Sequence, residues 1–302
     1  MRRGVLSRRL PRPRRAAGPQ GVWGPLLGSL VREKFFMGGL IIILAVALMG
    51  LLAPYAAPSK NFLATVGPPN QPPSLKYPLG TTGFGQDVLS QLLFGTRNTL
   101  FVATVAALIA TLIGLALGVI GGFLGGAVDA VFNFLTNTFL VIPTFTILLL
   151  IATIVKHPSL QLEAIIIGAF GWPWGARAYR SFALSMRSRD YVTVARLNGM
   201  SGLNIALTEV LPQMLPYIAI MLVMTLNGSL MADVGLDAIG LGPGNTITLG
   251  LMLNYAWGWG ALVYNWWWWW LPPVIVIILI ATSLTAVAMG MDRVFNPRLR
   301  GT

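Results

Sequence analysis

The sequence lacks the residues on which most enzymes depend. It contains no cysteine, which excludes a disulfide framework, a thiolate metal site and a thiol nucleophile. Its single histidine, His157, stands between Lys156 and Pro158 in a short polar break, where no second histidine exists to complete a metal or catalytic site. Only nine of its 302 residues are acidic, which leaves few carboxylates for acid–base chemistry. The composition therefore argues against an enzyme.

A phosphate-binding loop is missing as well. The glycines Gly121, Gly122, Gly125 and Gly126 follow an apolar run, but the lysine of the G-x-x-x-x-G-K-[ST] pattern is absent. We therefore expect this chain to hold no nucleotide, metal or other cofactor of its own and to hydrolyse no ATP.

What the sequence has in quantity is apolar residues, which make up 55% of the chain and gather into long blocks. A helix needs about 20 such residues to cross about 30 Å of hydrocarbon. The blocks cover residues 35–53, 100–123, 139–155, 214–232 and 271–291, with a weaker one at 164–178 that Pro173 interrupts and should kink. The sequence predicts an all-α polytopic membrane protein with about six transmembrane helices. Within the second block, Gly114, Gly118 and Gly122 form a small-residue face suited to close helix packing.

Positive charge is unevenly distributed along the chain. The net charge of +12 would suggest nucleic acid for a soluble protein, but nine of the 21 Lys and Arg residues precede residue 35, which topology explains better. Five more lie between the fourth and fifth spans and three follow the sixth, so 17 of 21 share one side and four the other. The distribution predicts a basic cytoplasmic tail at 1–34, both termini inside, and outer segments at 54–95 and 233–270.

Three motifs carry a family resemblance. Residues 77–97 read YPLGTTGFGQDVLSQLLFGTR, residues 190–199 read DYVTVARLNG with Leu211 and Pro212 following at a set distance, and residues 296–300 read NPRLR. Together they resemble the dipeptide and oligopeptide permease family of ATP-binding-cassette (ABC) transporters, in its second subunit type, over residues 35–301.

The resemblance implies a type I importer permease in the cell membrane. Such a chain would form half of a translocation path for peptides, with a second homologous permease, two ATPase subunits that bind ATP and Mg, an extracytoplasmic binding protein and membrane lipid as partners, and no nucleic acid. Relatives import oligosaccharides or nickel, so these substrates stay open. A secondary transporter is the alternative from another class, but paired mid-membrane charges and matching broken helices are not evident.

The cytoplasmic segment 184–212 is the candidate ATPase-docking loop. A helix-capable run at 184–198, a break at Gly199 and a resumption up to Pro212 predict a helix–turn–helix that a soluble partner can grip. An interfacial loop that only anchors the topology is the alternative. The candidate docking residues are Asp190, Tyr191, Thr193, Val194, Ala195, Arg196, Gly199, Leu211 and Pro212.

This loop departs from the family pattern at two positions. Thr193 and Val194 stand where the family has Glu and Ala, so docking should depend on shape, backbone, Asp190 and Arg196. A second departure lies before the third span. There Phe134 and Asn137 replace an Arg and an Asp, and both charges are lost together, as expected if the two normally pair.

The outer end of the predicted fifth and sixth spans holds the candidate translocation or mouth residues. Asp233 and Asp237 are interpreted as solvated acids at the membrane boundary, with a cation-attracting mouth as the alternative. The run from Trp266 to Trp270, including the candidates Trp266 and Trp267, is interpreted as an interfacial anchor, with a substrate-stacking platform as the alternative.

Overall fold

The computed structural model describes residues 28–155 and 158–295 of the 302-residue chain. The basic stretch 1–27, His157 with Lys156, and the motif at 296–300 lie outside the described residues. What the sequence predicted for them stays a prediction.

The described part of the chain is built of helices. In chain order these are α2 (Lys34–Leu51), α3 (Ala53–Ala56), α4 (Val88–Leu124), α5 (Gly126–Val141), α6 (Thr144–Val155), α7 (Leu160–Phe170), α8 (Pro173–Met186), α9 (Asp190–Leu197), α10 (Gly202–Ile205), the π-helical turn η1 (Ala206–Val210), α11 (Leu211–Ala238), α12 (Leu249–Gly258) and α13 (Trp267–Phe295).

Polar side chains start several of these helices at their N-caps. Asp87 accepts a hydrogen bond from the backbone N–H of Ser90 at the start of α4, at 2.7 Å. Ser159, Ser201 and Thr248 cap α7, α10 and α12 in the same way. Each cap satisfies a backbone donor that the helix itself leaves unpaired, which fixes where the apolar run begins to coil.

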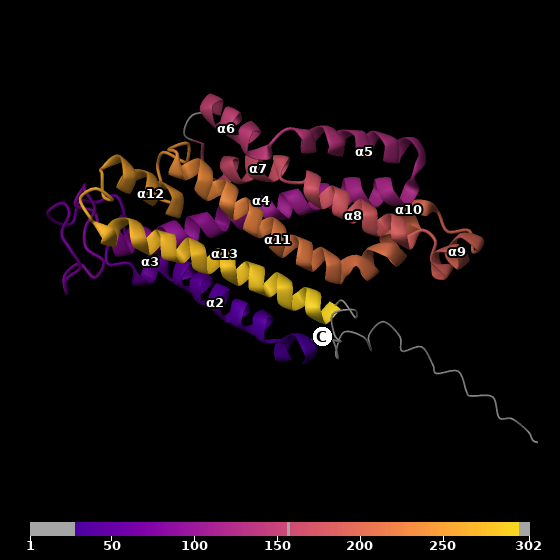
Figure 1. Cartoon of the computed structure of the whole chain (residues 1–302), viewed down its shortest axis with the longest axis horizontal. Helices are drawn as coiled ribbons and strands as arrows, with labels where there is room; N and C mark the ends of the chain where they lie inside the picture. The colour runs from indigo at the N-terminus through magenta and orange to yellow at the C-terminus, as the bar shows by residue number, and fades with distance from the viewer. Residues whose placement is uncertain (1–27, 156–157, 296–302) are drawn as a thin grey trace, which may run out of the picture.

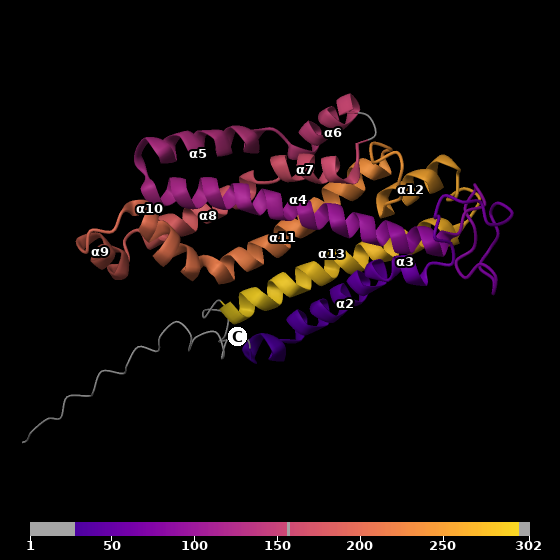
Figure 2. The same cartoon turned by 180° about the vertical axis from the view of Figure 1, so that it is seen from behind.

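The long helices form an elongated bundle in which α4 is central (Figure 1). Helix α4 packs along α7, α8 and α11, while α2 runs beside α13 (Figure 2). Helices α9 and α10 lie at one end of the bundle, and residues 57–87 together with α12 lie at the other (Figure 1). The segments predicted to be cytoplasmic and those predicted to be outer are therefore separated along the bundle axis.

Four helices are long and apolar enough to cross a membrane within the described residues, namely α2, α4, the continuous helix 202–238 and α13. The bent pair α5 and α6 adds a fifth. The weak span predicted at 164–178 is divided into α7 and α8, and the break directly precedes Pro173, as the kink prediction required.

Two span predictions were wrong in detail. The segment 139–155 is not one straight helix, because α5 and α6 meet at an angle of 77°. Ile142 is extended ahead of Pro143, the conformation that a following proline favours, and the helix therefore ends there. Helix α4 begins at Val88 rather than at residue 100, because the Asp87 cap starts it within the predicted outer segment.

The small-residue face predicted on α4 is confirmed. A Cβ atom at Gly118 would lie 2.5 Å from the carbonyl oxygen of Ala176, and one at Gly122 would lie 2.8 Å from that of Arg180. Both contacts are with α8, so these glycines let two helix backbones approach more closely than any side chain would permit.

Candidate functional site

Helices α9 and α10 form a small helix–turn–helix at the end of the bundle. Its inner side is anchored by Val192, Ala195 and Ile205, which are buried against Phe123 of α4 and Tyr179 of α8. Its outer side is apolar and uncovered in this chain: Val194, Leu197, Leu203 and Leu207 are 55%, 82%, 45% and 49% exposed, respectively. We call these four residues the docking face. A cluster of this kind is typical of a surface that another protein covers.

The turn between α9 and α10 is made by Gly199. Its φ of +78° lies in the left-handed region that disfavours residues with a Cβ atom. The Gly199 N–H donates to the Arg196 carbonyl at 3.0 Å, and the Met200 N–H donates to the Ala195 carbonyl at 3.2 Å. This geometry closes α9 and reverses the chain, as the break at Gly199 predicted.

The other predicted docking residues surround this turn. Asp190 begins α9, and Thr193 and Arg196 are exposed beside the docking face. The Arg196 guanidinium lies 5.8 Å from the ring centre of Phe123. Burial raises the pKa of the Tyr191 hydroxyl, which stays protonated and donates to the Met186 sulfur at 3.3 Å.

The predicted helix boundaries in this loop need two corrections. The run 184–198 is not one helix, because α8 ends at Met186 and α9 starts at Asp190. Pro212 does not mark a new entry into the membrane either. It lies inside one continuous helix, directly after the π-helical turn η1, where the helix departs from regular α geometry and can accommodate a proline. The last part of the loop, from Gly202, and the span after it are one continuous helix.

Two polar contacts connect α8, the helix that precedes this loop, to α5. Arg180 makes a bidentate ion pair with Asp129, with Nε–Oδ1 at 2.6 Å and Nη2–Oδ2 at 2.8 Å. Arg177 donates to the side-chain oxygen of Asn137 at 2.8 Å. Asn137 thus has an arginine partner on the neighbouring helix, although it replaces the family's aspartate, while Phe134 is 69% exposed.

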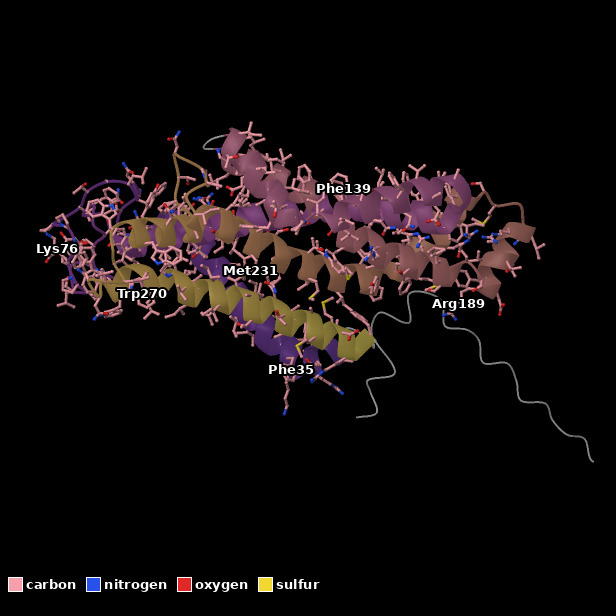
Figure 3. All side chains as sticks on the ribbon, turned by 45° about the horizontal axis from the view of Figure 1, so that its top comes forward. Phe35, Lys76, Phe139, Arg189, Met231 and Trp270 are labelled. Carbon is pink, nitrogen blue, oxygen red and sulfur yellow. The ribbon has the colours of Figure 1, made fainter. Side chains whose placement is uncertain are left out.

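A groove of about 550 Å³ runs along the middle of the bundle between α6, the α7–α8 break and α11. Its walls are mostly apolar and include Phe145, Trp174, Met224 and Met231, which are each at least 43% exposed. No ionisable side chain lines it within the described residues. We call it the central groove. Figure 3 shows Met231 between Arg189 at the docking end and Trp270 at the opposite end.

The acids near the end of α11 are not solvated, so that interpretation was wrong. Asp233 and Asp237 are 0% exposed, because α11 continues to Ala238 and buries both against α4, α7 and α12. Their carboxylates meet that of Glu163 on α7, with one oxygen of each within 4.8 Å of the others. Whether they belong to an outer mouth stays a prediction.

The tryptophan run lies at the same end of the molecule and packs mainly against the protein. Trp269 is 1% exposed, and the Trp268 indole donates to the Thr81 carbonyl at 3.3 Å. Trp266 stacks on Tyr264 with ring centres 5.0 Å apart, whereas Trp267 is 45% exposed. The run therefore ties α13 to the segment 57–87, which contains residues 77–87 of the first sequence motif. A role of Trp266 or Trp267 in translocation stays a prediction.

Sequence reasoning missed Glu163 and the central groove. Glu163 is the only acid in the apolar stretch 160–170, a position that marks functional candidates in membrane helices. Met221, Met224 and Met231 are spaced by three and seven residues, which places them on one helical face. The sequence thus contains both the isolated acid and the methionine spacing. Neither one identifies a site without the contacts that distant parts of the chain make with it.

Comparisons with known proteins agree over most of the chain. A family model described as "Binding-protein-dependent transport system inner membrane component" matches residues 110–301. The dipeptide transport system permease protein DppC of Haemophilus influenzae is 30% identical over 228 residues, covering 73% of this chain and 77% of that protein. The oligopeptide transport system permease protein OppC of Mycobacterium bovis is 28% identical over 204 residues, covering 67% of this chain and 68% of that protein. The match spans the helix–turn–helix, the central groove and the α4–α8 interface, and this chain therefore belongs to the family of inner membrane components of binding-protein-dependent transport systems.

Proposed function

We propose that this chain is a permease subunit that forms half of the translocation path for peptides in an ABC importer. The observation that carries the proposal is its similarity, across both the membrane bundle and the cytoplasmic loop, to proteins named as dipeptide and oligopeptide permeases. Peptides would be delivered from outside by a binding protein, and ATP with Mg would be bound by partner ATPases. Both termini would face the cytoplasm, in line with the distribution of arginines.

The docking face is the surface we assign to an ATPase subunit. The four exposed apolar side chains of the docking face come from α9, α10 and η1. Buried residues on the same short helices pack into the core and hold the docking face in place. Burial of apolar surface contributes about 25 cal/mol per Å², so a partner gains affinity here without the glutamate that the family pattern has at Thr193. Arg196 and Asp190 at the rim supply charge for orientation.

The central groove is the surface we assign to the translocation path and to a second permease. Its methionines are unbranched and polarisable, which suits contact with side chains of varied shape. Peptides present such variety. Nickel fits this groove poorly because its described lining offers no histidine, cysteine or carboxylate. Trp174, 69% exposed on the groove wall, is the feature that favours an oligosaccharide as the second candidate, since sugars stack on indole rings.

Uptake assays can test this assignment in a strain that lacks the chain. Complementation with the wild-type protein should restore the uptake of labelled di- or oligopeptides, but not that of a labelled maltooligosaccharide or of nickel. A Leu197→Glu variant should be inserted normally yet lose both ATPase co-purification and uptake, because it places a charge at the most exposed point of the docking face.

The matched control is Leu75→Glu, which changes a fully exposed leucine at the opposite end of the bundle. It should leave ATPase co-purification intact. If the wild-type protein restored the uptake of the sugar but not of peptides, the substrate would be an oligosaccharide. If the ATPase still co-purified with Leu197→Glu, the docking face would not be the ATPase-binding surface.

A further inference from the structure

The buried carboxylates Glu163, Asp233 and Asp237 form an acidic cluster where α4, α7, α11 and α12 converge. Asp233 and Asp237 are four residues apart and share one face of α11, while Glu163 comes from the first turn of α7. All three are at most 2% exposed. The hydroxyl groups of Thr99 and Thr248 are fully buried beside them.

The cluster is not satisfied by the protein around it. Of its six carboxylate oxygens, five accept no hydrogen bond of normal geometry from the described part of the chain, including both oxygens of Asp233 and both of Glu163, although the Thr99 hydroxyl lies close to Asp233 and Glu163 lies close to Asp237. The remaining one, Oδ2 of Asp237, accepts from the Thr248 hydroxyl. The described ion pairs involve Asp129 and Glu33 instead, so no described Lys or Arg lies within 4 Å of these groups. Lys156 lies outside the described residues.

Burying three carboxylates carries a free-energy cost that helix packing alone does not explain. An unpaired polar group in an apolar environment costs several kcal/mol, and buried carboxylates are normally paired or coordinate a metal. The structural role of Asp237, which holds the N-cap residue Thr248 of α12, needs only one oxygen and accounts for neither Asp233 nor Glu163. Two fully buried side chains therefore point their free oxygens into the same small space.

We propose that the acidic cluster binds a hard divalent cation. Its donor set is made of carboxylate and hydroxyl oxygens without nitrogen or sulfur, the set that suits Ca²⁺, Mg²⁺ and Mn²⁺. A Ca²⁺ ion with oxygens at about 2.4 Å bridges oxygens up to about 4.8 Å apart, and the three carboxylate atoms fall within 4.8 Å of one another. Two positive charges offset most of the charge of three carboxylates.

A pocket at the end of the bundle that holds α12 shares a wall residue with the cavity beside Glu163. A pocket of about 510 Å³ lies between residues 158–161 and 243–246, and Pro158 on its wall also borders the narrow cavity beside Glu163. Leu148 and Ile167 line both that cavity and the central groove. An ion in the cluster would thus stiffen one wall of the groove. The proposal does not depend on which solute the groove carries.

Equilibrium binding to the full-length chain in detergent tests the proposal. After chelator treatment, the wild-type protein should bind one equivalent of Ca²⁺, Mn²⁺ or Mg²⁺ per chain, with Na⁺ at the same ionic strength as the reference. Asp233→Asn and Glu163→Gln should each weaken binding at least about 10-fold, because they remove a charged ligand while keeping side-chain size. The control Asp292→Asn, an exposed acid at the other end of α13, should bind like wild type.

Thermal denaturation of the same samples separates a lost ligand from a lost fold. In chelator, Asp233→Asn should melt at or above the wild-type temperature, since it removes an uncompensated charge, but added cation should raise only the wild-type melting temperature. A wild-type chain that binds no divalent cation at 10 mM, as expected if the acids were neutralised by protons or by Lys156, would overturn the proposal. So would cation binding that is unchanged in both Asp233→Asn and Glu163→Gln.

Discussion

Replacing Gly199 isolates the backbone geometry of the docking turn from its side-chain contacts. The residue has φ of +78°, and no atom lies within 4 Å of the position that a Cβ would occupy. The Cβ atom of a larger residue therefore meets no steric clash. It meets only the cost of the left-handed conformation, about 1–2 kcal/mol for an L-residue. Because 1.4 kcal/mol is a factor of ten, Gly199→Ala and Gly199→Leu should each depopulate the native turn by about 5- to 30-fold relative to its alternatives.

The consequence should appear in coupling rather than in folding. The turn is exposed at the end of the bundle and holds the docking face in register through the Gly199 and Met200 backbone hydrogen bonds. In a reconstituted complex, we expect both variants to insert and assemble, with lower substrate-stimulated ATP hydrolysis and less solute transported per ATP. Gly199→Asn should stay near wild type, since asparagine tolerates positive φ. Asn198→Ala, next to the turn but with φ of −78°, should be silent.

Two results would refute this reasoning. If Gly199→Leu kept normal substrate-stimulated hydrolysis and uptake, the loop would not be the docking element. If Asn at position 199 were as harmful as Ala, the effect would not come from the left-handed backbone.

Other predictions concern packing, anchoring and topology. Gly118→Leu should lower the melting temperature in detergent by the equivalent of about 1–3 kcal/mol, because a Cβ there would lie 2.5 Å from a backbone oxygen of α8. Trp269→Ala should lower the free energy of unfolding by about 3–5 kcal/mol and Trp267→Ala by far less, since the first indole is 1% exposed and the second 45%. Single Trp→Phe changes should leave uptake near wild type if the run is an anchor. In this cysteine-free chain, a membrane-impermeant thiol reagent should label Leu75→Cys but not Ser185→Cys in intact cells, and the reverse pattern would overturn the orientation.

The sequence was informative where a single helix determined the outcome. Apolar blocks of about 20 residues became helices, and the four-residue spacing of Gly114, Gly118 and Gly122 identified the face that contacts α8. Gly199 was predicted as a turn because a helix-capable run ends there, and its φ is positive. In each case the physical cause is local in the chain.

Features that depend on contacts between distant segments were not predicted. The bend at Ile142 falls inside a stretch of uninterrupted apolarity, so hydropathy alone indicated a span across it, although Pro143 was a local warning. The sequence predicted solvated side chains for Asp233 and Asp237 because the apolar block ends at residue 232, whereas α11 continues to Ala238. Their burial depends on packing against α7, whose Glu163 lies seventy residues before Asp233 in the sequence.

The continuous helix from Gly202 to Ala238 acts as a lever arm that connects the α10–η1 part of the docking face to the two aspartates of the acidic cluster. Its 37 residues span about 55 Å at 1.5 Å per residue. Leu203 and Leu207 are near one end, and Asp233 and Asp237 are near the other. A tilt of about 10° about either end would carry the opposite end through about 10 Å, twice the pitch of an α-helix. A partner that rocks the α10 end of this helix by about 5° would therefore move the groove-lining Met224 and Met231, about 33 and 44 Å along it, by about 3–4 Å.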